Sequence, residues 1–209
     1  MKNILVLGAA GQIGSELVPY LRKLYGSNAV VAAYRSTPLT MEIREGGPCE
    51  NLDAMEADKI FEVVKKYSID TIINLVAVLS AKGEANPLKA WNINMGSLIN
   101  SLEIMREVKG AVFTPSSIGA FGPSTPLDNT PQDTIMRPTT IYGISKVAAE
   151  LWSDYYFLKY GVDTRGVRYP GIISNVTLPG GGTTDYAVEI YYEAIKNKHY
   201  TCYLKPGTY

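Results

Sequence analysis

Tyr142 and Lys146 lie four positions apart in the segment TIYGISKVAAE, residues 140–150. One turn of α-helix separates residues i and i+4, so the phenol and the ammonium would project from the same face. A free tyrosine ionises only near pH ~10, and a fixed cation beside it favours the phenolate. The pair could therefore move a proton to or from a bound hydroxyl group. The spacing fits equally a tyrosine packed in the core and a solvated helix lysine, so the rest of the chain has to decide.

The charge balance of the chain points to a small partner. The 209 residues include 20 Lys and Arg and 20 Asp and Glu, which leaves no net field to attract nucleic acid or an anionic membrane. No apolar run approaches the ~20 residues of a membrane span, and the first residues, MKNILVLGAAG, lack the features of a signal peptide. We therefore expect a soluble, cytoplasmic protein that binds neither nucleic acid nor membrane.

Metal and histidine chemistry are disfavoured. His199 is the only histidine, so a multi-histidine zinc site cannot be built and a Ser-His-Asp triad would depend on this one residue. Cys49 and Cys202 are too few for a disulfide framework, and we expect both to be reduced and structural. The sequence predicts no metal site.

Apolar runs alternate with amphipathic stretches along most of the chain. This order predicts a doubly wound parallel α/β sheet with helices on both faces. We expect a dinucleotide-binding domain over residues 1–171 and the start of a smaller, incomplete substrate-binding lobe over residues 172–209. The longest irregular stretch covers residues 119–138, and loops of that length are often functional. The expected strands cover 2–8, 29–34, 70–77, 110–117 and 162–171, and the expected helices cover 12–26, 55–67, 87–108 and 140–161.

Three glycines follow the first expected strand. Gly8, Gly11 and Gly14 have the spacing G-x-x-G-x-x-G and lead directly into a helix. Glycine permits a tight turn and a close approach of the backbone to a pyrophosphate, whose charge then lies at the positive end of the helix. A glycine triplet alone is weak evidence, but its place between strand and helix favours dinucleotide binding over an ordinary turn.

The end of the second expected strand lacks the acidic residue that usually binds the adenosine ribose. Tyr34 and Arg35 stand there instead. An arginine at this point can bind a 2′-phosphate, which favours NADP, although Arg35 could also stack on adenine or face solvent. Asp53, before the next helix, could bind the adenine amino group or simply act as an acid at a helix N-terminus.

Taken in order, the motifs resemble those of the extended short-chain dehydrogenase/reductase superfamily, which includes the nucleotide-sugar epimerases. They are the glycine turn, NLVAVLSA, Asn94, PSSIGAFG, Tyr142 with Lys146, and RYPG. The segments RYPGIIS and PGGGTTDYAVEIYYEA make the chain look more specifically like the short-chain type of L-threonine 3-dehydrogenase. The resemblance covers essentially the whole chain and implies a Rossmann fold of the extended type.

The resemblance implies oxidation of the 3-hydroxyl of L-threonine to 2-amino-3-oxobutanoate with hydride transfer to NAD(P). Tyr142 would take the hydroxyl proton, Ser117 would orient the oxygen, and Lys146 would hold the nicotinamide ribose and lower the pKa of Tyr142. Ser80, Thr183 and Thr184 would contact the substrate together with Ser117 and Tyr142. The cofactor contacts would be Gly8, Gly11, Gln12, Ile13, Gly14, Tyr34, Arg35, Leu52, Asp53, Leu75, Ala77, Asn94, Tyr142, Lys146 and Tyr169.

Two departures from the family pattern affect these expectations. The missing acid after the second strand leaves the choice of cofactor between NAD, which the family generally uses, and NADP, which Arg35 favours. The chain also stops at Tyr209, where the family continues through its substrate-binding lobe.

Two alternative functions remain open at this point. One is a nucleotide-sugar epimerase or dehydratase that shares the same site, and the other is a non-catalytic dinucleotide-binding protein. We also expect a homodimer packed through the two long helices, because the superfamily commonly pairs them. The apolar candidates for that interface are Trp91, Leu98, Leu102, Leu151, Tyr155 and Leu158, which could instead pack against the protein's own sheet.

Overall fold

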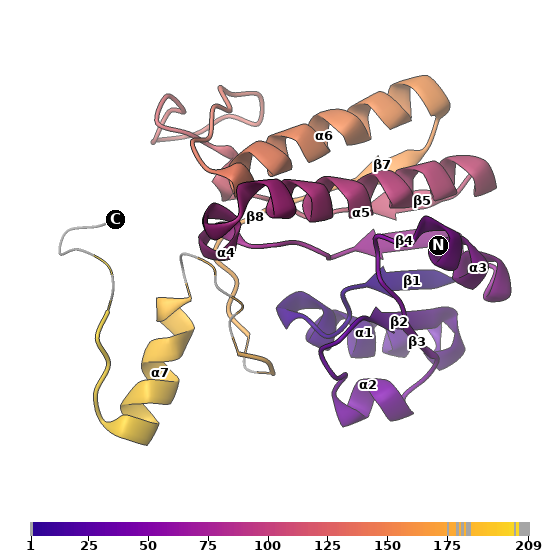
Figure 1. The fold of residues 1–209 in the computed structure, drawn as a ribbon, viewed down its shortest axis with the longest axis horizontal. Helices are drawn as coiled ribbons and strands as arrows, with labels where there is room; N and C mark the ends of the chain where they lie inside the picture. Colours follow the sequence, from indigo (N-terminus) through magenta and orange to yellow (C-terminus); the bar gives the residue numbers. More distant parts are fainter. Residues whose placement is uncertain are drawn as a thin grey trace.

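The computed structural model describes residues 2–174, 176–178, 180, 182, 185–202 and 204. These residues form a six-stranded parallel sheet with the order β3-β2-β1-β4-β5-β7 (Figure 1). A separate pair, β6 and β8, extends from the carboxyl edge of the sheet. The strands are β1 Ile4–Leu7, β2 Val30–Tyr34, β3 Cys49–Asn51, β4 Thr71–Asn74, β5 Ala111–Phe113, β6 Ser116–Ser117, β7 Asp163–Arg165 and β8 Arg168–Tyr169.

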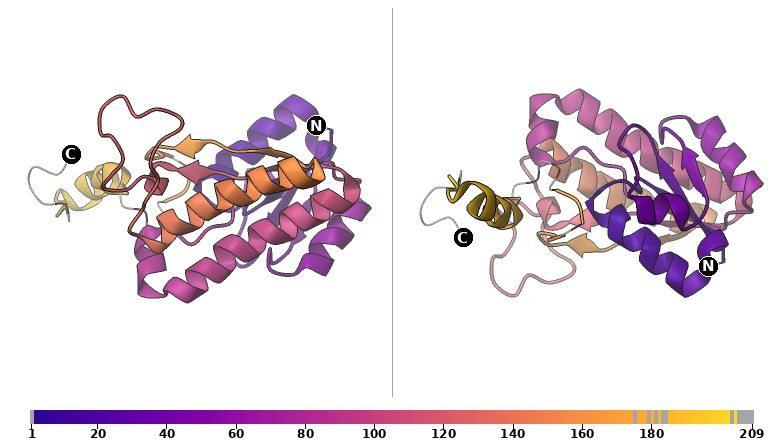
Figure 2. Two further views of the ribbon diagram at one scale, coloured as in Figure 1. Left: turned by 90° about the horizontal axis from the view of Figure 1, so that it is seen from above. Right: turned by 90° about the horizontal axis from the view of Figure 1, so that it is seen from below.

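Helices cover both faces of the sheet, which confirms the predicted doubly wound arrangement. The two longest, α5 and α6, run side by side across one face (Figures 1 and 2). In Figure 1, α7 lies apart from the sheet, beyond its carboxyl edge. The helices are α1 Gln12–Tyr25, α2 Met41–Glu45, α3 Ala57–Lys66, α4 Ser80–Ala85, α5 Pro87–Val108, α6 Ile141–Tyr160 and α7 Tyr186–Asn197, with 3₁₀ turns η1 Ser27–Ala29 and η2 Ile118–Ala120.

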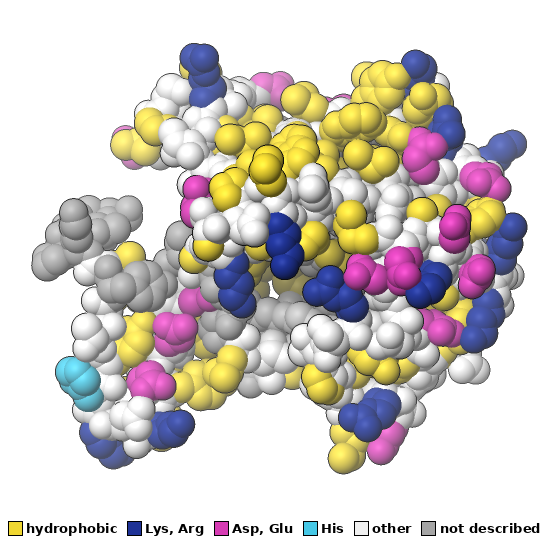
Figure 3. All heavy atoms as spheres, in the orientation of Figure 1, with side chains coloured by type: hydrophobic (Ala, Val, Ile, Leu, Met, Phe, Trp, Pro, Cys, Tyr) yellow, Lys and Arg dark blue, Asp and Glu magenta, His cyan; other side chains and the backbone are white. Residues whose placement is uncertain are grey.

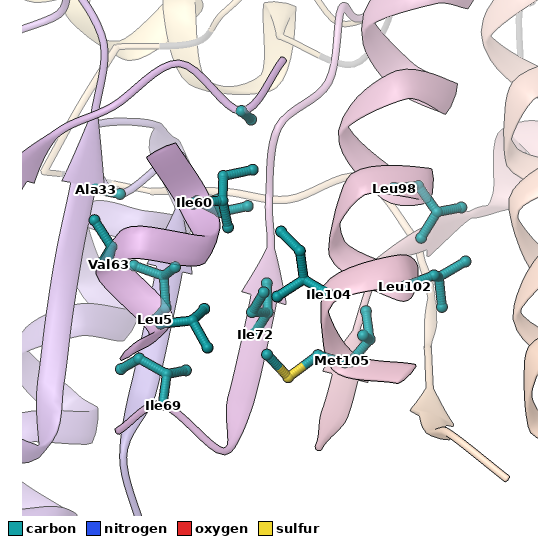
Figure 4. Packing of buried hydrophobic residues seen from close by; sticks show 14 of the residues in the cluster. Leu5, Ala33, Ile60, Val63, Ile69, Ile72, Leu98, Leu102, Ile104 and Met105 are labelled. Atoms are coloured by element: carbon teal, nitrogen blue, oxygen red, sulfur yellow. The ribbon is translucent and has the colours of Figure 1, made fainter. Parts of the chain in front are cut away.

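Side chains alternate between the two faces of each strand, so a separate hydrophobic core forms on each face of the sheet. In β1, Leu5 and Leu7 face the layer of α3, α5 and α6, whereas Ile4 and Val6 face α1 and α2. All four side chains are essentially inaccessible to solvent. Figure 4 shows the larger cluster, in which Ile104 and Met105 of α5 lie toward Ile72 of β4, whereas Leu98 and Leu102 project from the other side of the helix. Burial on both faces explains why the central strands are continuous apolar runs.

The long helix α6, which carries Tyr142 and Lys146, has clear signals at both ends. Thr140 accepts a hydrogen bond from the backbone N–H of Gly143 at 3.1 Å and so caps the first turn. Gly161 ends the helix in the left-handed conformation, with φ 71°. The spacing of Tyr142 and Lys146 therefore falls within regular helix, as the sequence predicted.

The structure corrects two details of the predicted strands. The expected strand over residues 162–171 is two short strands, because β7 joins the main sheet while β8 pairs with β6. The edge strand β3 was not predicted, because its residues Cys49, Glu50 and Asn51 lack an apolar pattern. The division at residue 171 into a binding domain and a second lobe stays a prediction.

The order of the strands locates a crevice. The chain moves outward from β1 to β2 and β3 and then crosses to β4 on the other side of β1. In doubly wound sheets ligands bind at this reversal, outside the carboxyl ends of the strands. The segments that leave β1 and β4 at this edge are the glycine turn and residues 75–79.

Candidate dinucleotide and catalytic site

The glycine turn after β1 is tightly built. Gly8 has φ +81°, a conformation that side chains disfavour, and a Cβ on Gly8 would lie 3.3 Å from the backbone of Leu75. A Cβ on Gly14 would lie 2.6 Å from the carbonyl oxygen of Gly8, so only glycine fits where α1 packs on the turn. Gly11 is the N-cap of α1, and within the described part of the chain no side chain caps this helix. The uncapped N–H groups and the positive end of α1 therefore fit a bound pyrophosphate.

Two asparagines hold the segment that follows β4. Asn74 accepts a hydrogen bond from the backbone N–H of Val76 at 3.1 Å. Asn94, on α5, accepts from the N–H of Val78 at 2.7 Å and donates to the Val78 carbonyl at 3.3 Å. Asn94 also donates to the hydroxyl of Ser145 on α6, at 3.1 Å. Asn94 therefore fixes the backbone that follows β4, and its predicted contact with the cofactor stays a prediction.

Ser117 and Tyr142 come together at the carboxyl edge of the sheet. Ser117 ends β6, and its hydroxyl accepts a hydrogen bond from the backbone N–H of Gly119 at 3.0 Å. A Cβ on Gly119 would lie 3.4 Å from Ser117 Oγ and 3.2 Å from the Tyr142 ring, so the two side chains approach the same point. Gly143 permits this approach, because a Cβ there would lie 2.2 Å from the carbonyl oxygen of Gly119. The α6 N-terminus can therefore dock directly on η2, and the serine and tyrosine can bind one oxygen atom between them.

Burial shapes the charge states of the pair on α6. Burial raises the pKa of the Tyr142 phenol above its usual value, and the hydrogen bond from Ser117 opposes this rise. Burial lowers the pKa of Lys146 from 10.5 to about 8, and the carboxylate of Glu150 opposes that fall. The lysine Nζ lies 5.4 Å from the centre of the Tyr142 ring and donates to the Pro115 carbonyl at 2.6 Å. The expected lowering of the tyrosine pKa by Lys146 is thus not realised in this arrangement.

Two residues near Lys146 were not predicted from the sequence. Glu150 lies one turn beyond Lys146 on α6 and accepts hydrogen bonds from Ser116 and from Arg168 of β8. Glu150 follows Lys146 at the same four-residue interval that links Tyr142 to Lys146, a signal that could have been noticed. Its partner Arg168 lies 18 positions away, so only the fold brings the two together.

The opposite end of the crevice carries an exposed ion pair. Arg35, after β2, contacts Asp53 at 3.3 Å, and their side chains are 62% and 31% exposed. Asp53 also accepts a hydrogen bond from the backbone N–H of Met55 at 3.0 Å, so it caps the following turn. Tyr34 is half-buried, and Leu52 is buried beneath this edge. These four residues lie at the ends of β2 and β3, where the sequence predicts the adenosine contacts, and the ion pair was not anticipated.

The remaining predicted site residues lie on α1, on β8 and on the segment between β4 and α4. Gln12 and Ile13 on α1 and Tyr169 on β8 border a cavity of about 410 Å³ that also reaches Ile172 and Ser174. Leu75, Ala77 and Ser80 are half-buried on the segment between β4 and α4, and Ser80 is the first residue of α4. Thr183 and Thr184, the other predicted substrate contacts, lie outside the described residues. No cluster of metal-ligating side chains occurs among the described residues, and none of the described helices is long and apolar enough to span a membrane.

The family to which this site belongs follows from comparison with known proteins. Residues 4–206 match the model of the NAD dependent epimerase/dehydratase family. The chain belongs to this family.

Several individual members of the family are similar to this chain along its whole length. The chain is 52% identical to an uncharacterised epimerase/dehydratase of Staphylococcus aureus over all 209 of its residues, which make up 65% of that protein. Among solved structures, an L-threonine dehydrogenase of Clostridium difficile is 56% identical with a TM-score of 0.91, over 98% of this chain and 64% of the other. A monomeric L-threonine 3-dehydrogenase from a metagenome is 40% identical with a TM-score of 0.91, over 97% of this chain and 64% of the other. The chain thus spans about 65% of the length of the curated relatives it matches.

Proposed function

We propose that this protein oxidises the 3-hydroxyl group of L-threonine to 2-amino-3-oxobutanoate, with NAD as the hydride acceptor. The observation that carries the proposal is the approach of Ser117 and Tyr142 to each other beside Gly119, with Lys146 one turn farther along α6. The arrangement stands beside a turn built to accept a pyrophosphate. The similarity to the Clostridium difficile L-threonine dehydrogenase supports threonine as the substrate.

Each side chain has a distinct part in the reaction. Ser117 donates a hydrogen bond to the reacting oxygen, and Tyr142 as phenolate accepts the proton of the substrate hydroxyl. When bound, NAD accepts the hydride that leaves the same carbon. Lys146 binds the cofactor ribose through its ammonium, and Ser117, not Lys146, is the group that lowers the pKa of Tyr142 against the effect of burial. Ser80 holds the amino or carboxylate group of the substrate.

NAD fits the adenosine end better than NADP. Arg35 is the only cation that the sequence offers at the end of β2 to bind a 2′-phosphate, and it is paired with Asp53. A 2′-phosphate would have to compete with this carboxylate and would be repelled by it. An uncharged ribose hydroxyl avoids the repulsion and can donate to Asp53, which compensates for the missing acid at position 34.

Turnover assays separate the proposal from its alternatives. Formation of NADH from L-threonine, with no conversion of a UDP-sugar, is the expected result. Interconversion of a UDP-sugar without net NADH would instead support a sugar epimerase, and cofactor binding with no turnover of either would support a non-catalytic dinucleotide-binding protein. L-Serine and L-allothreonine serve as matched substrates, because they test the methyl group and the configuration at the carbon that is oxidised.

We further propose that two copies associate through α5 and α6. Leu151, Tyr155 and Leu158 on α6 are 61%, 43% and 81% exposed, and hydrophobic side chains gather over this face (Figure 3). Leu98 and Leu102 were wrong candidates, because both are buried in the protein's own core, and Trp91 packs against that core as well. Sedimentation at micromolar concentration tests the association. A dimer that Leu158→Glu converts to monomer supports it, whereas a wild-type monomer, the state named for the metagenome dehydrogenase, contradicts it.

A further inference from the structure

Lys146 is a buried lysine in an environment that disfavours its charged form. Its side chain is only 9% exposed, and its Nζ donates to the carbonyl of Pro115 at 2.6 Å. Among the described residues it makes no ion pair with a carboxylate, because the nearest acid, Glu150, is bound elsewhere. An isolated buried ammonium tends to lose its proton. Some feature of the fold has to keep this lysine both charged and pointed toward the crevice.

Glu150 is held firmly away from Lys146. Its two oxygens form a forked contact with Arg168, at 2.9 Å to Nε and 2.7 Å to Nη2, and it also accepts from the Ser116 hydroxyl. The two side chains are 17% and 22% exposed, so the pair is largely shielded from solvent. Bidentate contacts of this kind fix geometry as well as charge.

Arg168 is fixed in turn by the long loop over residues 119–138. Its Nη1 donates to the Gln132 carbonyl at 2.9 Å, and its guanidinium lies 5.6 Å from the centre of the Phe121 ring. The pair therefore joins α6, β8 and this loop behind the catalytic residues. A carboxylate with so many donors cannot swing toward the ammonium one helical turn away.

Few other charged or titratable groups act on Lys146. On its own helix it faces Tyr142 and Glu150, and the β6–β8 pair contributes Arg168 and Tyr169. The other groups of the surrounding elements act elsewhere. Glu84 of α4 accepts from the N–H of Ile141, Asp133 of the loop acts on Arg168, and Glu103 of α5 binds Tyr156 at the far end of α6.

We propose that Glu150 and Arg168 are positioning residues for Lys146: the carboxylate keeps the lysine charged, and the arginine keeps the carboxylate from closing on it. The ammonium then stays at the Pro115 carbonyl, beside Tyr142. This inference rests on the proposed function, because it assumes that a charged Lys146 binds the cofactor. It assigns a role to two residues that touch neither cofactor nor substrate.

The two partners should act on Lys146 in opposite directions. Replacing Glu150 with glutamine removes the negative charge that favours the ammonium, so Lys146 should lose its proton at lower pH. Replacing Arg168 with methionine leaves the carboxylate without its competing cation, so Lys146 should keep its proton to higher pH. Damage to packing alone would not produce shifts of opposite sign.

The test measures the dissociation constant of NAD by calorimetry from pH 6 to pH 9.5, without any substrate. For the wild-type protein we expect binding to weaken above about pH 8, where Lys146 deprotonates. Glu150→Gln should move this inflection down by about one pH unit, equivalent to roughly fivefold weaker binding at pH 8. Arg168→Met should move it up, and Arg168→Lys, which retains the charge, should return it toward the wild-type position.

The matched control is Glu103→Gln. Like Glu150, Glu103 is a carboxylate paired with an arginine, Arg106, and it accepts a hydrogen bond from the Tyr156 hydroxyl at the far end of α6. This control should leave the inflection unchanged. The inference is overturned if the variants weaken NAD binding equally at every pH, or if both move the inflection in the same direction. A wild-type profile without an inflection overturns it as well, even if one variant fails to fold. Because no threonine is present, those results would leave the proposed function standing. Failure of the wild-type protein to bind NAD would overturn both.

Discussion

The two ends of the crevice use the same chemical pair in different surroundings. At the adenosine end Arg35 meets Asp53 through one contact of 3.3 Å, with the arginine side chain 62% exposed. At the catalytic end Arg168 meets Glu150 through a fork, with both side chains mostly covered. Exposed ion pairs contribute little and rearrange easily, whereas shielded bidentate pairs define geometry. From this comparison we expect a fixed geometry around Lys146 and a more adjustable contact at Arg35.

The largest effect should come from the catalytic end. Tyr142→Phe removes one hydroxyl group and keeps the ring, so NAD should bind nearly as tightly while the turnover of L-threonine falls by about 10²- to 10⁴-fold. Steady-state kinetics and calorimetry measure the two quantities. Turnover within a few-fold of the wild-type rate would remove Tyr142 from the role of base.

A smaller effect is expected on stability, and it tests how strongly the surroundings of Lys146 are shielded from solvent. Lys146→Met should stabilise the protein at pH 7 by on the order of 1–3 kcal/mol, because it removes a buried charge, and should also abolish turnover. The upper value corresponds to a fall in the lysine pKa from 10.5 to about 8. Urea unfolding at pH 7 measures the difference in the free energy of unfolding.

The stability difference between the wild type and Lys146→Met should also depend on pH, in a direction set by the lowered pKa of Lys146. Below pH 8 the lysine is protonated in both the folded and unfolded states, so the folded state carries the full cost of the buried charge. Between pH 8 and 10.5 the unfolded state holds a proton that the folded state has released, so this group makes wild-type stability rise with pH. The advantage of Lys146→Met should therefore shrink above pH 8. A variant that is less stable than wild type at pH 7 would contradict the account.

The smallest effect belongs to the exposed end. Asp53→Asn should strengthen NADP binding by roughly two- to fivefold, because it frees Arg35 and removes the repulsion of a 2′-phosphate. Arg35→Ala should leave NAD binding nearly unchanged and weaken whatever NADP binding exists. Dissociation constants for both nucleotides decide the matter. Equal changes for NAD and NADP in both variants would show that the pair does not discriminate between them.

The sequence was sufficient for features that depend on local spacing. The glycine turn, the helices α1, α3, α5 and α6, and Tyr142 with Lys146 follow from periodicity and from residues a few positions apart. The contacts between distant segments were not accessible in this way. The Arg168–Glu150 fork joins β8 to α6, and the Pro115 carbonyl reaches Lys146 only after the sheet has formed.

Several residues differ from what their type led us to expect, because burial and local contacts determine what they do. Leu98 and Leu102 have the apolar character of an interface, but both are buried in the core cluster that α5 shares with the central strands and α6. The pKa of Tyr142 was expected to fall beside Lys146, yet burial raises it. Asn94, predicted as a cofactor contact, also holds the backbone of Val78, which residue type did not indicate. In these cases the surroundings, and not residue type alone, set what the side chain contacts.

The central claim is that hydride leaves C3 of L-threonine within this crevice, and isotope transfer tests it most directly. The protein is incubated with NAD and L-threonine that carries deuterium at C3, and the NADH formed is analysed by mass spectrometry. We expect one deuterium atom in each NADH molecule and a slower rate than with ordinary threonine, and we expect Tyr142→Phe to form very little. NADH without deuterium, or the same yield from Tyr142→Phe, would contradict the account.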